Sequence, residues 1–327
     1  MLKKLMILLT VLSAALAGCG GGRNLPAQPL KQVRLPMGYI PNVQFAPFYV
    51  GVEKGYFKEE GIEIQFDYSF ETDGVQLVGA GELSFSLASG EQVLLARAQG
   101  LPVVYSYAWY NNFPVSVIAA PELNVHKPAD LKGKDIGLPG LFGASYIGLE
   151  ALLFSGGVEA SQVRMEAIGF NQVEAFAAGQ KKAVVVYTTN EPVVLKARGI
   201  PFTEVRVADY LQLVANGVIT NEKTIREDPE LVRGMNRALA RAIRDTAANP
   251  DEAYEICKKY VENLAQADEA VQKQVLATSI EFWKVDQPGQ SDPQAWTNMN
   301  DLLVKMGLLT QPEDVSQAYT NEFIPQP

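Results

Sequence analysis

Apolar and polar positions along the chain follow the period of a strand in some segments and that of a helix in others. Residues 62–66 (Ile-Glu-Ile-Gln-Phe) alternate with a period of two, as a half-buried strand does, whereas residues 46–54 have helical spacing and end at Gly55. Ser89 is expected to cap the helix that follows it. The first series of predicted elements consists of strands at 33–39, 62–66, 83–88 and 103–107, with helices at 46–54, from 72 onward, and at 91–98.

A second series with the same order begins after Pro121. Residues 183–187 (Ala-Val-Val-Val-Tyr) are apolar almost throughout, which is typical of a strand buried on both faces. Residues 213–220 are interpreted as an extended crossing segment, and the pattern from residue 221 onward is helical, with Asp228 capping a long helix that reaches residue 247. The predicted elements of this series are strands at 135–138, 163–168, 183–187 and near 202–205, with helices at 144–153, 172–178 and 192–197.

Two strand–helix series followed by a returning helical segment predict an α/β fold of two lobes with a ligand cleft between them. Residues 32–118 and 221–327 are expected to form lobe 1, and residues 119–220 to form lobe 2. The two series resemble each other in architecture but not in sequence.

The amino-terminal segment has the pattern of an export signal. Lys3 and Lys4 precede an apolar run at 5–16, which is shorter than the ~20 apolar residues of a permanent membrane span. Leu16-Ala17-Gly18-Cys19 resembles the lipobox of bacterial lipoproteins, which implies cleavage after residue 18 and lipidation of Cys19; the alternative is an ordinary secretory signal with a chance cysteine. Residues 19–31 are rich in Gly and Pro and are expected to be a flexible tether. These features predict a protein anchored by its lipid to the extracytoplasmic face of the cell membrane.

The amino-acid composition argues against several classes of function. The net charge of −9 argues against binding to nucleic acid or adhesion to anionic lipid, because both need basic patches. The chain has one histidine and two cysteines, too few for a zinc site, a haem site or a His-based triad. His126 lies in a polar stretch and is expected to be a solvated loop residue, and Cys257 is expected to be a buried small hydrophobe. We therefore expect no metal, no cofactor, no catalytic residue and no enzymatic activity.

The candidate ligand contacts follow predicted strands, because ligands of open α/β sheets bind outside the carboxyl ends of the strands. Tyr39, Trp109 and Tyr110 each lie beside polar turn residues and offer flat faces for stacking. Core packing is the better interpretation for three other aromatic residues, namely Phe48, Tyr49 and Phe85.

Two further turns carry polar groups. The turn from Gly140 to Ser145 precedes a helix and could present backbone N–H groups to an anion; it lacks the lysine of a P-loop, and a tight turn without a ligand is an equal alternative. Glu191 follows a buried strand and precedes Pro192, so it either complements a helix dipole or accepts hydrogen bonds from ring nitrogens and amines.

Two motifs resemble type II periplasmic binding proteins for thiamine-precursor pyrimidines, alkanesulfonates and taurine. They are Glu53-Lys54-Gly55-Tyr56-Phe57-Lys58-Glu59-Glu60-Gly61-Ile62 and Pro128-Ala129-Asp130-Leu131-Lys132-Gly133-Lys134-Asp135-Ile136-Gly137. The resemblance covers roughly residues 33–245 and implies the two-lobed type II periplasmic-binding-protein fold.

Gly169-Phe170-Asn171 and Tyr187-Thr188-Thr189-Asn190-Glu191-Pro192 look like the branch that binds thiamine-precursor pyrimidines and riboflavin for ABC importers. The resemblance implies ligand contacts at Tyr39, Asn42, Asn190 and Glu191, and less firmly in the Gly140–Ser145 turn. The residues expected to bind the ligand are Tyr39, Asn42, Trp109, Tyr110, Gly143, Ser145, Tyr187, Asn190 and Glu191.

Trp109-Tyr110-Asn111-Asn112-Phe113 has more aromatic residues than a one-ring ligand needs, which favours riboflavin. A thiamine-precursor pyrimidine is the alternative ligand, and an alkanesulfonate is less favoured. The expected partners are a flat heteroaromatic molecule and the permease of an ABC importer, and the protein is expected to be a monomer. Two rival functions are a pyrimidine synthase of the same superfamily, which carries a cysteine-rich iron motif and consumes its own histidine with a pyridoxal cofactor, and a ligand-sensing partner of a membrane receptor.

Overall fold

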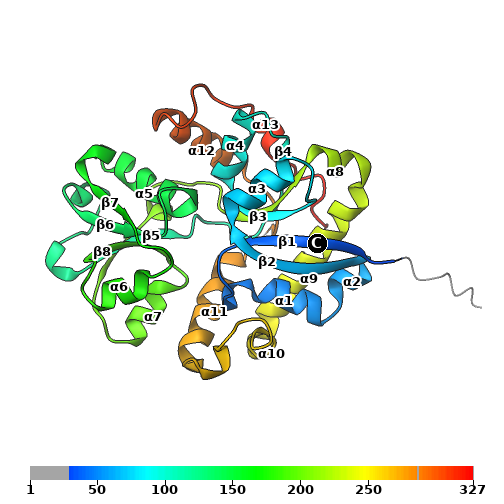
Figure 1. The fold of residues 1–327 in the computed structure, drawn as a ribbon, viewed down its shortest axis with the longest axis horizontal. Helices are drawn as coiled ribbons and strands as arrows, with labels where there is room; N and C mark the ends of the chain where they lie inside the picture. The colour runs from blue at the N-terminus through cyan, green and yellow to red at the C-terminus, as the bar shows by residue number, and fades with distance from the viewer. Residues whose placement is uncertain (1–28, 286, 327) are drawn as a thin grey trace, which may run out of the picture.

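The computed structural model describes residues 29–285 and 287–326, so the expected signal peptide, Cys19 and most of the tether lie outside the described residues. Figure 1 shows two α/β lobes side by side. The strands are β1 Lys31–Gly38, β2 Ile62–Phe70, β3 Ser86–Ser89, β4 Val103–Ala108, β5 Val115–Ala119, β6 Asp135–Leu138, β7 Arg164–Ala167, β8 Ala183–Tyr187, β9 Thr203–Arg206 and β10 Asn216–Asn221. The helices are α1 Ala46–Glu53, α2 Tyr56–Glu59, α3 Glu71–Gly79, α4 Gly90–Ala98, α5 Gly143–Ser155, α6 Gln172–Ala177, α7 Glu191–Ala197, α8 Glu222–Glu227, α9 Pro229–Ala248, α10 Pro250–Cys257, α11 Glu269–Trp283, α12 Pro293–Lys305 and α13 Val315–Ala318.

Lobe 1 contains β1–β4 together with β10. Strands β1 and β2 pair in parallel, and β10 lies between β3 and β4 and runs antiparallel to both. The hydroxyl of Ser86 in β3 donates a hydrogen bond of 3.3 Å to the carbonyl oxygen of Pro36 in β1. The two sheets therefore lie next to each other in the order β2-β1-β3-β10-β4. Helices α3 and α4 cover one face, and α1 and α9 cover the other (Figure 1).

Lobe 2 contains a five-stranded sheet in the order β7-β6-β8-β5-β9, in which β5 runs antiparallel to β8 and β9. Helix α5 packs on one face of this sheet, and α6 and α7 pack on the other (Figure 1). The arrangement repeats that of lobe 1, with one antiparallel strand next to the edge strand. Val184, Val185 and Val186 of β8 are fully buried, as the apolar pattern of this strand predicted.

Two segments carry the chain between the sheets, namely residues 109–114 between β4 and β5, and residues 207–215 between β9 and β10. Strand β5 pairs in lobe 2 although its residues were expected to end lobe 1, and β10 pairs in lobe 1 although it was expected to be a crossing segment. We propose that the lobe boundaries lie in these two segments. Strand β10 was missed because it has polar ends: Thr220 and Asn221 are buried there by donating to the carbonyl oxygens of Ser84 (2.8 Å) and Val78 (2.9 Å).

Ser89 stands at the N-cap position of α4, as the sequence predicted, but its side chain makes no capping hydrogen bond. Its hydroxyl lies instead between the carboxyl groups of Glu71 and Glu91. The expected side-chain cap was wrong because the hydroxyl, whose oxygen would accept a backbone N–H at a cap, is directed toward two buried carboxyl groups.

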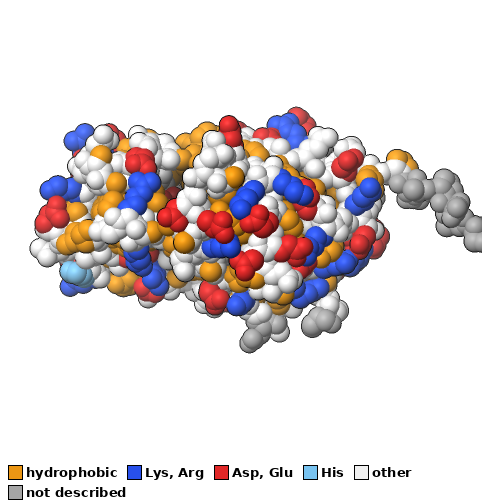
Figure 2. Space-filling model, turned by 90° about the horizontal axis from the view of Figure 1, so that it is seen from below, with side chains coloured by type: hydrophobic (Ala, Val, Ile, Leu, Met, Phe, Trp, Pro, Cys, Tyr) orange, Lys and Arg blue, Asp and Glu red, His pale blue; other side chains and the backbone are white. Residues whose placement is uncertain are grey.

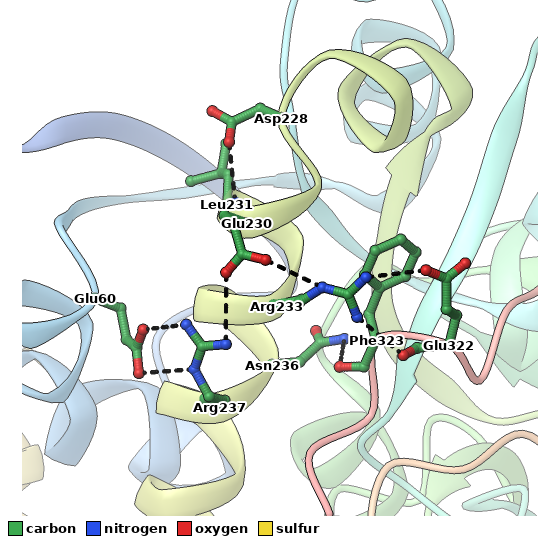
Figure 3. Close-up of polar contacts among 9 residues, drawn as sticks. All are labelled: Glu60, Asp228, Glu230, Leu231, Arg233, Asn236, Arg237, Glu322 and Phe323. Carbon is green, nitrogen blue, oxygen red and sulfur yellow. Dashed lines mark hydrogen bonds and ion pairs between the residues drawn. The ribbon is translucent and has the colours of Figure 1, made fainter.

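Helix α9 connects the C-terminal segment to lobe 1 (Figure 3). Asp228 caps it as predicted, accepting a hydrogen bond of 3.1 Å from the backbone N–H of Leu231. The buried amide of Asn236 donates to the carbonyl oxygens of Ser106 in β4 (2.9 Å) and of Phe323 near the C-terminus (3.2 Å). These buried bonds hold the end of the chain against the sheet of lobe 1 more firmly than the exposed ion pairs around them, which are each worth ~0–1 kcal/mol.

The surface carries charges of both signs. Figure 2 shows acidic and basic side chains intermingled over one face of the molecule. His126 is exposed and Cys257 is fully buried, as expected, and burial raises the pKa of the Cys257 thiol to about 12. Within residues 29–285 and 287–326, no helix is long and apolar enough to cross a membrane, and no cluster of His, Cys, Asp and Glu could hold a metal ion.

Candidate functional site: an aromatic cleft between the lobes

A cleft opens between the two lobes and contains about 880 Å³ of empty space, part of which is open solvent. Its walls come from the carboxyl ends of β1, β2, β4, β6, β7 and β8, and from the first residue of β10, which reaches the same edge because this strand is antiparallel. Binding sites of open α/β sheets lie at this edge, because the loops after parallel strands meet there.

The deep wall of the cleft is aromatic. Trp109 lies 5.6 Å from Phe45 with the rings inclined by 29°, and 4.8 Å from Tyr110 with the rings nearly perpendicular. All three side chains are at least 96% buried and line the cleft. Because each ring is held by its neighbours, this wall presents rigid aromatic surface to the cleft.

The rim of the cleft is a row of aromatic rings from both lobes. Tyr39 of lobe 1 meets Phe170 of lobe 2 edge to face at 4.6 Å, and Phe70 of lobe 1 meets Phe142 of lobe 2 in the same way at 5.6 Å. Phe170 also lies 5.8 Å from Phe70. Phe70 and Phe142 are each 47% exposed, so these contacts join the lobes where the cleft meets solvent.

Glu191 is the carboxyl group of lobe 2 that lines the cleft. It is the first residue of α7, where its carboxylate accepts hydrogen bonds from the backbone N–H of Tyr187 (2.9 Å) and the amide of Asn190 (3.4 Å). The side chain of Tyr39 reaches it from lobe 1. Burial raises the pKa of Glu191 to about 7, and the hydrogen bonds limit this rise by favouring the ionised form.

Glu71 is the corresponding carboxyl group of lobe 1 and follows β2. It accepts hydrogen bonds from the amide of Asn216 (2.6 Å) and from the hydroxyl of Ser89 (2.9 Å), and the same hydroxyl contacts Glu91 behind it. A hydroxyl has a single proton, so simultaneous contact with both carboxyl groups needs a proton on one of them. Burial, and then the nearby charge of Glu91, raise the pKa of Glu71 to about 8.

Two hydrogen bonds cross the cleft between the lobes. The amide of Gln44 donates to the hydroxyl of Thr189 at 2.5 Å, and the hydroxyl of Tyr187 donates to the side-chain oxygen of Asn216 at 3.1 Å. With the aromatic rim, they hold the lobes together in a closed arrangement.

The structure brings most of the residues selected from the sequence to this cleft. Eight of the nine line it: Tyr39, Trp109, Tyr110, Gly143, Ser145, Tyr187, Asn190 and Glu191. Asn42 is not among the lining residues; its side-chain oxygen accepts the backbone N–H of Gln44 (3.0 Å) and caps the short helical turn Val43–Phe45. Phe48, Tyr49 and Phe85 are fully buried core residues, as expected.

Sequence reasoning missed several lining residues, notably Gln44, Phe70, Glu71, Gln172 and Asn216. Glu71 was missed because the predicted strand ended at residue 66, whereas β2 continues to Phe70 and Glu71 follows it directly. Asn216 was missed because it belongs to a strand that the pattern did not predict.

Comparison with known sequences places this architecture in a family. The model of the family described as "NMT1/THI5 like" matches residues 42–253. The chain is 42% identical to the riboflavin-binding protein RibY of Chloroflexus aurantiacus, over 91% of this chain and 88% of that protein. It is 29% identical to the formylaminopyrimidine-binding protein of Halalkalibacterium halodurans, over 98% of each chain. It is also 23% identical to a 4-amino-5-hydroxymethyl-2-methylpyrimidine phosphate synthase of Legionella pneumophila, over 90% of this chain and 92% of that protein.

Solved structures share the fold at low identity. The alkanesulfonate-binding protein SsuA of Xanthomonas axonopodis superposes with a TM-score of 0.68 at 16% identity, covering 89% of this chain and 98% of that chain. The periplasmic nitrate-binding protein NrtA of Synechocystis superposes with a TM-score of 0.70 at 13% identity, covering 90% and 87%. The chain therefore belongs to the NMT1/THI5-like family and has the two-lobed type II periplasmic-binding-protein fold.

Proposed function

We propose that this protein binds riboflavin between its lobes, outside the cytoplasmic membrane, and presents it to the permease of an ABC importer. The observation that carries the proposal is the aromatic wall of Phe45, Trp109 and Tyr110, three mutually packed rings that all line the cleft between the lobes. The 42% identity to a protein named for riboflavin binding supports the same ligand.

The proposed binding mode uses the two kinds of surface in the cleft. The three-ring isoalloxazine stacks on the deep wall, gaining the area burial of a large aromatic system and ~0.5–1.5 kcal/mol for each ring pair beyond it. Its polar edge carries an N–H donor between two carbonyl acceptors. The carboxylate of Glu191 accepts from this N–H, and the amide of Asn190 donates to a carbonyl. We propose that Asn42 acts indirectly, by capping the turn that carries Gln44 and Phe45.

Binding is proposed to coincide with closure of the lobes. The segments 109–114 and 207–215 connect the sheets and would serve as the hinge. In the closed form the Gln44–Thr189 and Tyr187–Asn216 hydrogen bonds cross the cleft. The permease would recognise this closed form.

A thiamine-precursor pyrimidine is the second candidate ligand, favoured by the 29% identity to a formylaminopyrimidine-binding protein. A single ring could use Glu191 and Asn190 but would cover only part of the aromatic wall. An alkanesulfonate fits the cleft poorly, because none of the described lining residues carries a positive charge to pair with a sulfonate.

We propose a binding protein and not an enzyme, although relatives named as synthases share the family. His126, the single histidine, is exposed in lobe 2 and does not line the cleft, so it is badly placed to react with a bound molecule. Recovery of riboflavin unchanged in mass after prolonged incubation with the protein would agree with this proposal, and a modified product would contradict it.

We further propose that the mature chain is a monomer that begins at a lipidated Cys19. Because several acyl chains anchor a protein stably, the wild-type protein should partition with membranes when its gene is expressed in bacteria. A Cys19→Ala variant should be released from them. Membrane association of this variant equal to that of the wild type would refute the anchor.

Titration of the unfolded, washed and refolded protein with riboflavin tests the proposed ligand. Flavin fluorescence should be quenched with a 1:1 endpoint at micromolar or lower concentration. The Glu191→Ala variant should bind ~30-fold more weakly and melt near the wild-type temperature, whereas Glu262→Ala on the exposed surface should bind as the wild type does. Absence of quenching would exclude riboflavin as the ligand. Unchanged affinity in Glu191→Ala would exclude Glu191 from the binding site.

A further inference from the structure

The charged groups of the cleft are all acidic. Glu71 of lobe 1 and Glu191 of lobe 2 line it, and Glu91 lies directly behind Glu71. Among the described residues that line the cleft there is no Lys, Arg or His. A ligand buried here would therefore find hydrogen-bond acceptors, amides and hydroxyls, but no positively charged side chain.

The same holds for the space next to the rim. A second hollow of about 710 Å³ adjoins the cleft between α3, α4 and α5 and shares Phe142 and Gly143 with it. Its described lining also contains no Lys, Arg or His. A charged tail that left the cleft on this side would pass the ring pair of Phe70 and Phe142 and enter another cavity without a counter-charge.

We propose that the cleft takes the vitamin with its uncharged polyhydroxyl tail and rejects the phosphate ester of the same vitamin. This inference rests on the proposed riboflavin function. A hydroxyl both donates and accepts, so it can bond to the carboxyl of Glu71 and to the amide of Asn216, which lie 2.6 Å apart. A phosphate group accepts only, and burying it without a positive partner forfeits its hydration.

The N-terminus of α5 in lobe 2 attracts anions and therefore reduces the preference for riboflavin over its phosphate ester. Helix α5 begins at the cleft with Gly143, and its first turn has neither an acidic residue nor a side-chain cap. Its free N–H groups and dipole, equivalent to about half a positive charge, would attract an oxygen atom. A phosphate dianion carries a larger charge than this dipole compensates, and the adjacent carboxyl groups oppose it, whereas a hydroxyl oxygen fits the N–H groups without a charge penalty.

Parallel titrations of the wild-type protein with riboflavin and riboflavin 5′-phosphate test the inference. Riboflavin should bind at least ~100-fold more tightly, which corresponds to ~2.8 kcal/mol at 1.4 kcal/mol per factor of ten. Binding of both molecules within threefold would overturn the inference and leave the proposed function intact. Failure of both to bind would instead overturn the proposed function.

Variants at the rim separate charge from shape. Phe142 is exposed enough to accept a polar side chain, so Phe142→Arg adds a positive charge there and Phe142→Gln is the neutral control. The preference is the dissociation constant of riboflavin 5′-phosphate divided by that of riboflavin. This ratio should be at least tenfold smaller in Phe142→Arg than in Phe142→Gln. In Glu71→Gln it should be ~3-fold or more smaller than in the wild type. Equal preference in the two Phe142 variants would show that missing positive charge is not the cause, and an unchanged preference in Glu71→Gln would exclude Glu71 from the selection.

Discussion

The amide of Gln44 in lobe 1 donates a hydrogen bond of 2.5 Å to the hydroxyl of Thr189 in lobe 2, and both side chains are buried. Thr189 directly precedes Asn190 and Glu191, so separation of the lobes at this point would break the bond. This contact contributes to affinity by stabilising the closed state, beyond any contact that Gln44 makes with the ligand as a lining residue of the cleft.

Replacing Gln44 by Ala should therefore weaken ligand binding ~5- to 20-fold, because a buried hydrogen bond contributes roughly 1–2 kcal/mol once its partner is left unpaired. Calorimetric titration measures this loss. The melting temperature of the ligand-free variant should change little, since the bond joins two lobes with separate sheets. Gln274→Ala, at an exposed position on α11, is the matched control and should bind as the wild type does. Equal affinity in both variants would rule out the closure role of Gln44.

Riboflavin affinity should fall as the pH drops below about 7. Glu191 has a pKa raised to about 7 by burial, and the proposed acceptor is its ionised form. Protonation below that pH competes with binding and can lower the affinity by up to tenfold per pH unit. Titrations from pH 5 to 9 measure the slope, and Glu191→Gln should flatten it below pH 7. A wild-type profile that is already flat between pH 5 and 7 would mean that the ligand does not bond to the carboxylate of Glu191.

Tryptophan fluorescence should report ligand stacking at one position. The chain has three tryptophans, of which Trp109 lines the cleft, while Trp296 stacks on Tyr319 away from it. Trp109→Phe keeps most of the buried volume and should bind riboflavin ~10-fold more weakly; at saturation the remaining quenching should come mainly from Trp283, whose ring lies 6.0 Å from that of Trp109. Trp296→Phe should keep both the affinity and the quenching. Equivalent behaviour of the two variants would place the ligand elsewhere.

Thermal stability should decrease as the pH rises from 6 to 9, in part because of Glu71. The pKa of Glu71 in the folded state is raised to about 8, from a usual value near 4.5, by burial and by the charge of Glu91. Between these two values the folded chain holds a proton that the unfolded chain has released, so stability is lost as the pH rises through this window.

Glu71→Gln should therefore lose less stability than the wild type between pH 6 and 9. The difference in Tm should be a few degrees, since ~1 kcal/mol shifts Tm by roughly 2–4 °C in proteins of this size. Glu262→Gln, at an exposed site, should follow the wild type. If the Tm of wild type and Glu71→Gln fell in parallel, Glu71 would carry no proton in the folded state at neutral pH.

The sequence pattern predicted most elements because their apolar positions decide their burial. Strand β8 is apolar almost throughout, and α9 begins at Asp228 and Pro229 as its capping residues indicate. Strand β10 was not predicted because its last two residues are polar and are buried through hydrogen bonds to backbone carbonyls that are distant in sequence, one in α3 and one in the segment after it. Strand β5 was missed as well. The sheet to which a strand belongs depends on the strands beside it, and these are not encoded in the local pattern of apolar and polar residues.

In the candidate site, too, the sequence predicted the residues that lie at strand ends but not the contacts that depend on the folded chain. Residues after predicted strands, such as Tyr39 and Glu191, reach the cleft because the topology gathers strand ends at one edge. Asn42 was selected by resemblance, yet its side-chain oxygen accepts a hydrogen bond from a backbone N–H of its own turn. Asn side chains often form such local hydrogen bonds. The contact of the Ser89 hydroxyl with both Glu71 and Glu91 depends on distances that only the folded structure supplies.

Calorimetric titration of ligand-free protein with riboflavin tests the central claim most directly. We expect one site per chain, a dissociation constant of about 1 µM or lower, and a negative heat-capacity change from burial of the aromatic ligand. No heat of binding with riboflavin up to about 100 µM, together with saturable binding of a formylaminopyrimidine to the same preparation, would contradict the account and assign the cleft to a one-ring ligand.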